Sequence, residues 1–312
     1  MLYAVKINNM NYAFSKKNTN WLRAVGSVIL IMIHTIEELS YNSNYFFETL
    51  GKCGFLVVSL FFLLSGYGLN KSKLKDPIKY ISNFNKTRYF NILIPLLLVW
   101  IVYSLFSIVL DNVFFSFNFL NIVCYSWFVV VILGVYVCFY ICNRISLNYG
   151  TLLLSLVICL FIIISITYNI PPIYSKCLSS ILLGLWLPIL ENKKRIIAIL
   201  FFVLSLFLSI GILVVTNNLI ISSLCKVYIF SVFIYLFSRF ISFDSAFLRY
   251  ISNHSYLIYL LHGLSIKIIM TRYGPESSFF FSLAMIFLVT IILAILIKKV
   301  EVVVIDQIRK YV

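Results

Sequence analysis

Two ionisable residues of one apolar stretch are spaced to act on the two ends of a long substrate. Arg23 and His34 stand eleven residues apart in WLRAVGSVILIMIHTIEE. In an α-helix this spacing returns both side chains to nearly one face, about 16 Å apart along the axis. An arginine can hold a phosphate through charge-assisted hydrogen bonds, and a histidine can take a proton from a hydroxyl group. The pair therefore suits a substrate with an anionic head and a distant reactive end.

Two carboxylates follow the histidine at spacings that allow contact. Glu37 and Glu38 come three and four residues after His34, so either can reach the imidazole along a helix. A carboxylate there would fix the tautomer and stabilise the imidazolium. The spacing alone does not choose between them. The competing interpretation is that Arg23 anchors the helix at the membrane surface and that His34 is an interfacial polar residue.

The composition shows what kind of molecule must position these groups. The chain has 312 residues, of which 62% are hydrophobic and 11% charged, and its mean hydropathy is +1.03. Soluble domains carry about 25% charged residues. This excludes a soluble single domain, a disordered chain, a collagen-like fibre and a disulfide-stapled secreted module. The remaining class is a protein of the lipid bilayer.

Long apolar runs predict an all-α fold of about ten transmembrane helices. The runs are continuous, whereas barrel strands would alternate over about ten residues, and a helix satisfies its own backbone hydrogen bonds in lipid. The ten runs are 21–36, 53–69, 90–110, 119–142, 151–168, 178–190, 196–216, 219–238, 250–271 and 278–297.

The distribution of lysine and arginine along the chain predicts how the protein is oriented in the membrane. With the N-terminus in the cytosol, 20 of the 25 basic residues fall on the inner side. This bias follows the positive-inside rule and places both termini in the cytosol. We therefore attribute the net charge of +15 to topology in a multi-pass cell membrane protein, with the bilayer as partner and no nucleic acid.

The chain reads as one membrane domain over residues 1–312. It includes a basic cytosolic loop, 70–88, and a short cytosolic tail, 298–312. The loop alternates basic and apolar residues, so an amphipathic helix at the inner interface is one interpretation of it. The seven cysteines show no CxxC pattern, and we expect neither a metal site nor a permanently bound cofactor.

Several short motifs, in this order, resemble the membrane acyltransferases of acyltransferase family 3. After the Arg-x10-His pair come FFLLSGYGLNKS, KTRYFNILIPLLL, WFVVVILGVYVCFY and SYLIYLLHG. The resemblance runs from about residue 18 to 297. It implies O-acylation, most often O-acetylation, of sugars in bacterial surface glycans.

The resemblance also implies roles for individual residues. His34 matches the essential histidine of the family, and Arg23 the arginine before it. Asn91 departs from the pattern, because many members have a second arginine there. The other implied or candidate donor-binding residues are Ser65, Tyr67, Lys86, Arg88, Tyr259 and His262. Lys86 and Arg88 could instead be membrane anchors. His262 could instead be a histidine that packs between helices.

The leading hypothesis is an integral membrane O-acyltransferase that uses acetyl-CoA or another acyl-CoA. Its acceptor would be a hydroxyl of a surface polysaccharide or of a lipid-linked sugar, with His34 as general base, so activity should fall as acid protonates the ring. Direct transfer and transfer through a transient acyl group both remain open. The alternative function is a polytopic transporter or flippase for a polar lipid-linked substrate, which would move its substrate without covalent change.

Overall fold

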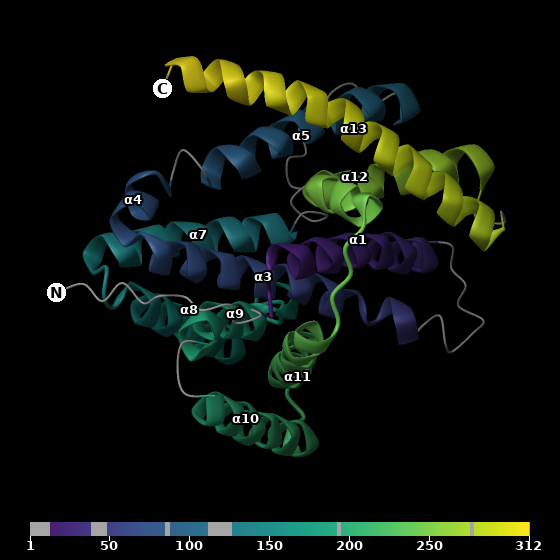
Figure 1. Cartoon of the computed structure of the whole chain (residues 1–312). Helices are drawn as coiled ribbons and strands as arrows, with labels where there is room; N and C mark the ends of the chain where they lie inside the picture. Colours follow the sequence, from purple (N-terminus) through teal and green to yellow (C-terminus); the bar gives the residue numbers. More distant parts are fainter. Residues whose placement is uncertain are drawn as a thin grey trace.

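The computed structural model describes residues 13–38, 49–84, 88–111, 127–191, 195–274 and 278–311. Within these ranges the chain consists of helices and short connections, without a strand. The elements are α1 Lys16–Glu38, α3 Gly54–Lys75, α4 Pro77–Ser82, α5 Phe90–Asp111, α7 Trp127–Ile145, α8 Gly150–Thr167, η2 Pro172–Tyr174, α9 Leu178–Glu191, α10 Arg195–Val215, α11 Leu219–Phe240, α12 Ala246–Tyr273 and α13 Phe279–Tyr311 (Figure 1). The all-α prediction is confirmed.

Seven helical stretches in the described ranges are long and apolar enough to cross a bilayer. They contain α1, α3, α7, α8, η2 together with α9, α11 and most of α13. Each of the ten predicted runs contains a helix, although the start of the run 119–142 lies outside the described residues. In α5 and α10 the apolar stretches are shorter. Helix α12 has 28 residues but a polar first half, which includes Ser252 and Asn253. The count of ten spans therefore remains a prediction.

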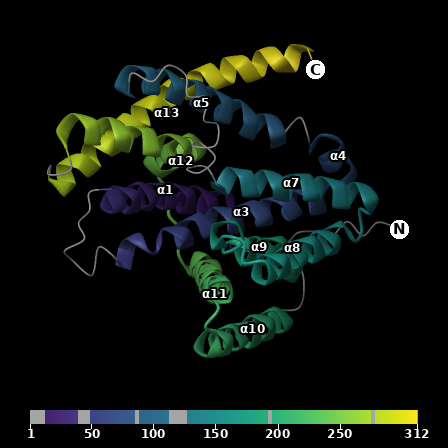
Figure 2. The same ribbon diagram turned by 180° about the vertical axis from the view of Figure 1, so that it is seen from behind.

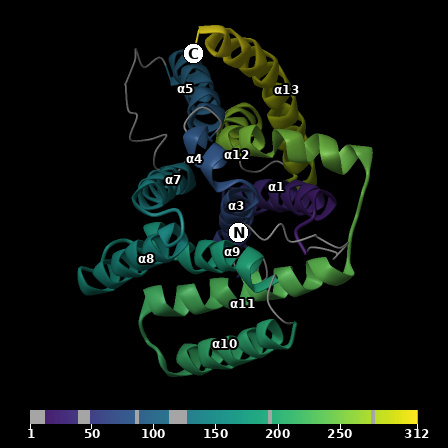
Figure 3. The same ribbon diagram turned by 60° about the vertical axis from the view of Figure 1, so that its left-hand side comes forward.

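Helices α8 and α10 turn large apolar side chains outward. Leu156 of α8 is 58% exposed, and Phe207 and Leu208 of α10 are 71% and 65% exposed. Figure 3 shows α10 at the edge of the bundle, below α11 and remote from α12 and α13. A continuous apolar surface of this kind suits lipid tails and would be unfavourable in water.

Helix α1 lies in the middle of the bundle and packs against α3 and α12, while α12 also packs against α13 (Figures 1 and 2). Near one end of α1, the Ser252 hydroxyl donates to Asn20 Oδ1 at 3.3 Å. Near the other end, the rings of His34 and His262 stack at 4.9 Å. The two contacts show that α1 and α12 run parallel. We call the contact between these two helices the α1–α12 seam.

The Ser-Gly-Tyr motif of α3 lies where this helix crosses α9. A Cβ atom on Gly66 would come within 2.5 Å of the Ile181 carbonyl oxygen, and one on Gly184 within 2.3 Å of the Leu63 carbonyl oxygen. Two glycines thus let the backbones approach closely, as small residues do in membrane bundles. Gly66 serves helix packing here.

The segment 70–88, for which an amphipathic helix was one interpretation, is mostly helical over its described residues 70–84 and 88. Its first residues extend α3 to Lys75, and Pro77 then starts the short helix α4. The Asp76 side chain caps α4 by accepting the Lys79 backbone N–H at 3.1 Å. The expected tail is likewise helical, because α13 continues to Tyr311. In Figure 1, α4 and the last turns of α13 lie toward the same left-hand side of the bundle.

Candidate active site

The outer end of the seam, as oriented by the predicted topology, holds a histidine–carboxylate pair. His34 Nδ1 lies 2.6 Å from Glu37 Oε2, and the two side chains are 37% and 44% exposed. Because a carboxylate only accepts, Nδ1 carries the proton, and Nε2 keeps the lone pair that a general base needs. Glu38 is exposed at the end of α1. Of the two carboxylates considered from the sequence, Glu37 is the one that contacts the ring.

A second imidazole lies directly against the first. His262 is 8% exposed, and its ring stacks on that of His34 with an interplanar angle of 26°. His262 Nδ1 lies 2.5 Å from the carbonyl oxygen of Tyr259. A carbonyl also only accepts, so this nitrogen is protonated and Nε2 is again the lone-pair atom. A neutral His262 therefore cannot donate a hydrogen bond from Nε2 to a developing oxyanion.

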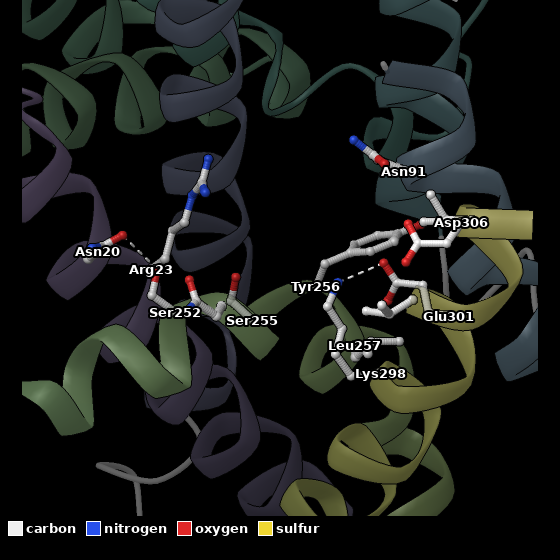
Figure 4. A pocket seen from close by; sticks show the side chains of 13 residues that line it. Asn20, Arg23, Asn91, Ser252, Ser255, Tyr256, Leu257, Lys298, Glu301 and Asp306 are labelled. Carbon is white, nitrogen blue, oxygen red and sulfur yellow. Dashed lines mark hydrogen bonds and ion pairs between the residues drawn. The ribbon is translucent and has the colours of Figure 1, made fainter. Parts of the chain in front are cut away.

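The other end of the seam opens into a polar cavity of about 490 Å³ between α1, α5, α12 and α13. Figure 4 shows Arg23 on one side of this cavity and Tyr256, Glu301 and Asp306 on the other. The lining residues are Asn20, Arg23, Asn91, Ser252, Asn253, Ser255, Tyr256, Leu257, Lys298, Glu301, Val302, Ile305 and Asp306. We call it the α1–α13 cavity. Arg23 thus faces a space that a ligand can occupy.

A second arginine lies within electrostatic range of Arg23. Arg88, two residues before α5, interacts with the charge of Arg23, and both arginines interact with the phenol of Tyr136. Arg88 Nε donates to the Tyr80 hydroxyl at 3.1 Å, and the guanidinium lies over the Tyr80 ring. Burial raises the pKa of Tyr80 despite this cation, so the hydroxyl stays neutral at physiological pH. Lys86, the other basic candidate of this segment, lies outside the described residues.

Residues 17–299 match the sequence profile of the acyltransferase domain of acyltransferase family 3. The chain belongs to this family. No curated protein and no solved structure gives a match. The matched range contains both ends of the seam, whereas Glu301 and Asp306 of the cavity lie just beyond it.

Other candidates from the sequence occupy different places in the acyltransferase. The Tyr67 hydroxyl donates to Glu191 Oε2 at 2.9 Å and accepts from Lys71 Nζ at 2.8 Å, in a second packing cluster with Phe14. Ser65 is half-buried on the same helix. Tyr259 is buried beside His262 and interacts with the backbone of Phe128. Of these three, only Tyr259 contacts the histidine pair.

The sequence does not reveal the α13 wall of the cavity. The sequence predicts only a short cytosolic tail over 298–312 of the acyltransferase, yet Glu301 of this segment is buried and lines the cavity beside α12. A usable signal exists in the sequence KKVEVVV, where one acidic residue follows Lys298 by three positions among apolar ones. That spacing places both side chains on one helix face. In the described part of the chain, no group of three or more metal-ligating side chains is close enough to hold an ion.

Proposed function

We propose that this acyltransferase moves an acyl group, acetyl in the first instance, from cytosolic acyl-CoA to a hydroxyl of a cell-surface or lipid-linked sugar. The observation that carries the proposal is the seam itself. It has an arginine beside a cavity at one end and an oriented, partly exposed imidazole at the other. We place the protein in the bacterial cytoplasmic membrane with ten spans and both termini in the cytosol.

The donor fits the length of the seam. Its phosphates would pair with Arg23 and Arg88, the two neighbouring arginines at the cavity end. Its pantetheine arm would then run along α1 toward His34, about 16 Å away along the helix axis. The thioester would thus reach the imidazole while the phosphates stay at the cytosolic side.

The proposed chemical step needs one base that can return its proton. His34 Nε2 removes the proton from the sugar hydroxyl as its oxygen bonds to the thioester carbonyl carbon. The tetrahedral intermediate then expels the CoA sulfur, which takes the proton back from the imidazolium. The products are the O-acylated sugar and free CoA. Glu37 stabilises the imidazolium between the two steps, because its carboxylate already binds Nδ1–H at 2.6 Å.

Mass analysis of surface glycans tests this function. Cells that carry the gene should yield glycans heavier by one acyl group per modified sugar than cells without it, and their membranes should release CoA from acetyl-CoA. The flippase alternative predicts a different result. The glycans would then have equal mass with and without the gene, and the sugar would cross the membrane only in cells that carry it.

A further inference from the structure

A buried carboxylate in the α1–α13 cavity has an unused hydrogen-bond acceptor. Glu301 is 4% exposed, and its Oε1 accepts from Lys298 Nζ at 2.7 Å. Its Oε2 is buried and has no hydrogen-bond partner among the described residues. Figure 4 shows this carboxylate beside Tyr256 at the wall of the cavity. A buried oxygen without a donor is unfavourable, so the site is incomplete without a group that donates to it.

The charges around the cavity divide it into two halves. On the α1 side, Arg23 favours an anion. On the α13 side, the Lys298 ammonium pairs with Glu301, and Asp306 leaves this side with one net negative charge that disfavours an anion. The rest of the lining is mostly amide and hydroxyl groups, from Asn20, Asn91, Asn253, Ser252 and Ser255. The α13 half is therefore suited to an uncharged polar group that carries N–H donors.

We infer that the α13 half of the cavity binds the adenine of the CoA donor, with Glu301 Oε2 accepting a hydrogen bond from the exocyclic amino group. The inference rests on the proposed function, because it assigns a contact to the donor named there. The volume of about 490 Å³ lies in the range of small-molecule sites. In CoA one ribose joins the adenine to the phosphates, and the pantetheine arm leaves the diphosphate at its other end. With a phosphate at Arg23 and the arm along α1, the adenine lies on the α13 side. Glu301 becomes a specificity residue of the donor site.

Binding of two nucleotides to the purified full-length protein in detergent tests the inference without an acceptor sugar. The probes are CoA and 1,N6-etheno-CoA, in which the amino group is closed into an extra ring and can no longer donate. The wild type should bind etheno-CoA roughly tenfold or more weakly than CoA, as expected for a lost hydrogen bond to a charged group. Equal dissociation constants for the two nucleotides would overturn the inference.

The Glu301→Gln variant locates the contact. Its amide oxygen should stay with the Lys298 ammonium, so an NH2 group replaces the free acceptor and the preference for CoA over etheno-CoA should disappear. Glu38→Gln, which changes an exposed carboxylate of α1, should keep the preference. A Glu301→Gln protein that still prefers CoA tenfold contradicts the assignment. If this variant does not fold, the wild-type comparison still decides whether the amino group is recognised.

The same titrations separate this inference from the proposed function. A wild type that binds neither nucleotide overturns both, since the donor is then not CoA. A wild type that binds CoA and etheno-CoA equally well overturns only the role of Glu301.

Discussion

Two charged clusters in this bundle look alike in composition and differ in what surrounds the carboxylate. Glu191, at the end of α9, is 4% exposed in its side chain, accepts from Tyr67 and lies 3.9 Å from Arg239. Lys71 binds the same tyrosine. Glu301 is equally buried and binds Lys298. Each carboxylate has one buried oxygen without a hydrogen-bond partner in the described residues. That oxygen of Glu191 faces Arg239, whereas Glu301 lines a cavity.

The difference separates charges that are paired within the helix packing from charges that line a cavity. The α3–α9–α11 cluster brings its own cations and tyrosine from three helices, so it stabilises their packing. The α1–α13 cavity leaves Arg23 and Glu301 facing an open volume. A buried charge by itself is therefore weak grounds for a site, because structural ion pairs are also buried.

The largest effect should come from the end of the seam that holds His34. Replacing His34 with alanine removes the proposed base and should lower kcat by about 10²–10⁴-fold. The variant should keep the wild-type melting temperature and CoA affinity, because the ring is partly exposed. His254→Ala serves as the matched control, since that ring lies against Tyr250 of its own helix. Near-normal acyl transfer by His34→Ala membranes would remove the base from the mechanism.

A substitution in the α3–α9–α11 cluster should lower the stability of the protein. Replacing Glu191 with alanine leaves Arg239 and Lys71 without their carboxylate. We expect the free energy of unfolding to fall by about 2–3 kcal/mol. The fall is smaller than for a fully buried ion pair because the Arg239 side chain is 34% exposed. Thermal unfolding in detergent should show the loss, while the folded fraction should bind CoA normally. A large fall in CoA affinity at unchanged stability would mean that the two clusters are not distinct in function.

The end of the seam that holds Arg23, the proposed phosphate-binding residue, should show its effect in the affinity for the donor. Arg23→Ala should weaken CoA binding by roughly tenfold to thirtyfold, as expected for loss of a charge-assisted hydrogen bond. Arg144→Ala, at the exposed end of α7, is the matched control. The affinity of Arg23→Ala should also depend less on salt than that of the wild type. If both variants bind CoA as the wild type does, the phosphates are held elsewhere.

The smallest effect should distinguish the two neighbouring glutamates. Glu37→Gln should lower kcat by about tenfold with little change in KM, because it weakens the stabilisation of the imidazolium. Glu38→Gln should leave both parameters unchanged, since that side chain is exposed. Equal losses in the two variants would indicate a general charge effect rather than the Glu37 contact.

The helices could be predicted from the sequence because lipid imposes a simple rule. Apolar runs must form helices there, and each predicted run contains one in the structure. The Arg23–His34 pair was predictable for the same reason, since helix periodicity fixes which residues share a face. The choice of Glu37 over Glu38 was not, because both spacings allow contact and the side-chain rotamers decide.

Contacts between distant segments could not be predicted. The stacking of His34 on His262 and the bond from Ser252 to Asn20 depend on α1 and α12 packing in parallel. The same holds for Glu301, whose place in the cavity follows from α13 continuing past the expected end of its span. Neither periodicity nor composition specifies which helices become neighbours.

The position of a bound, non-reactive acyl-CoA thioether tests the central claim most directly. An experimental structure of the wild type with this analogue should place its phosphates at Arg23 and Arg88. Its acyl carbon should lie within about 6 Å of His34 Nε2, which leaves room for one sugar hydroxyl between them. An acyl carbon that lies far from the imidazole, with the arm leading away from the α1–α12 seam, would contradict the account.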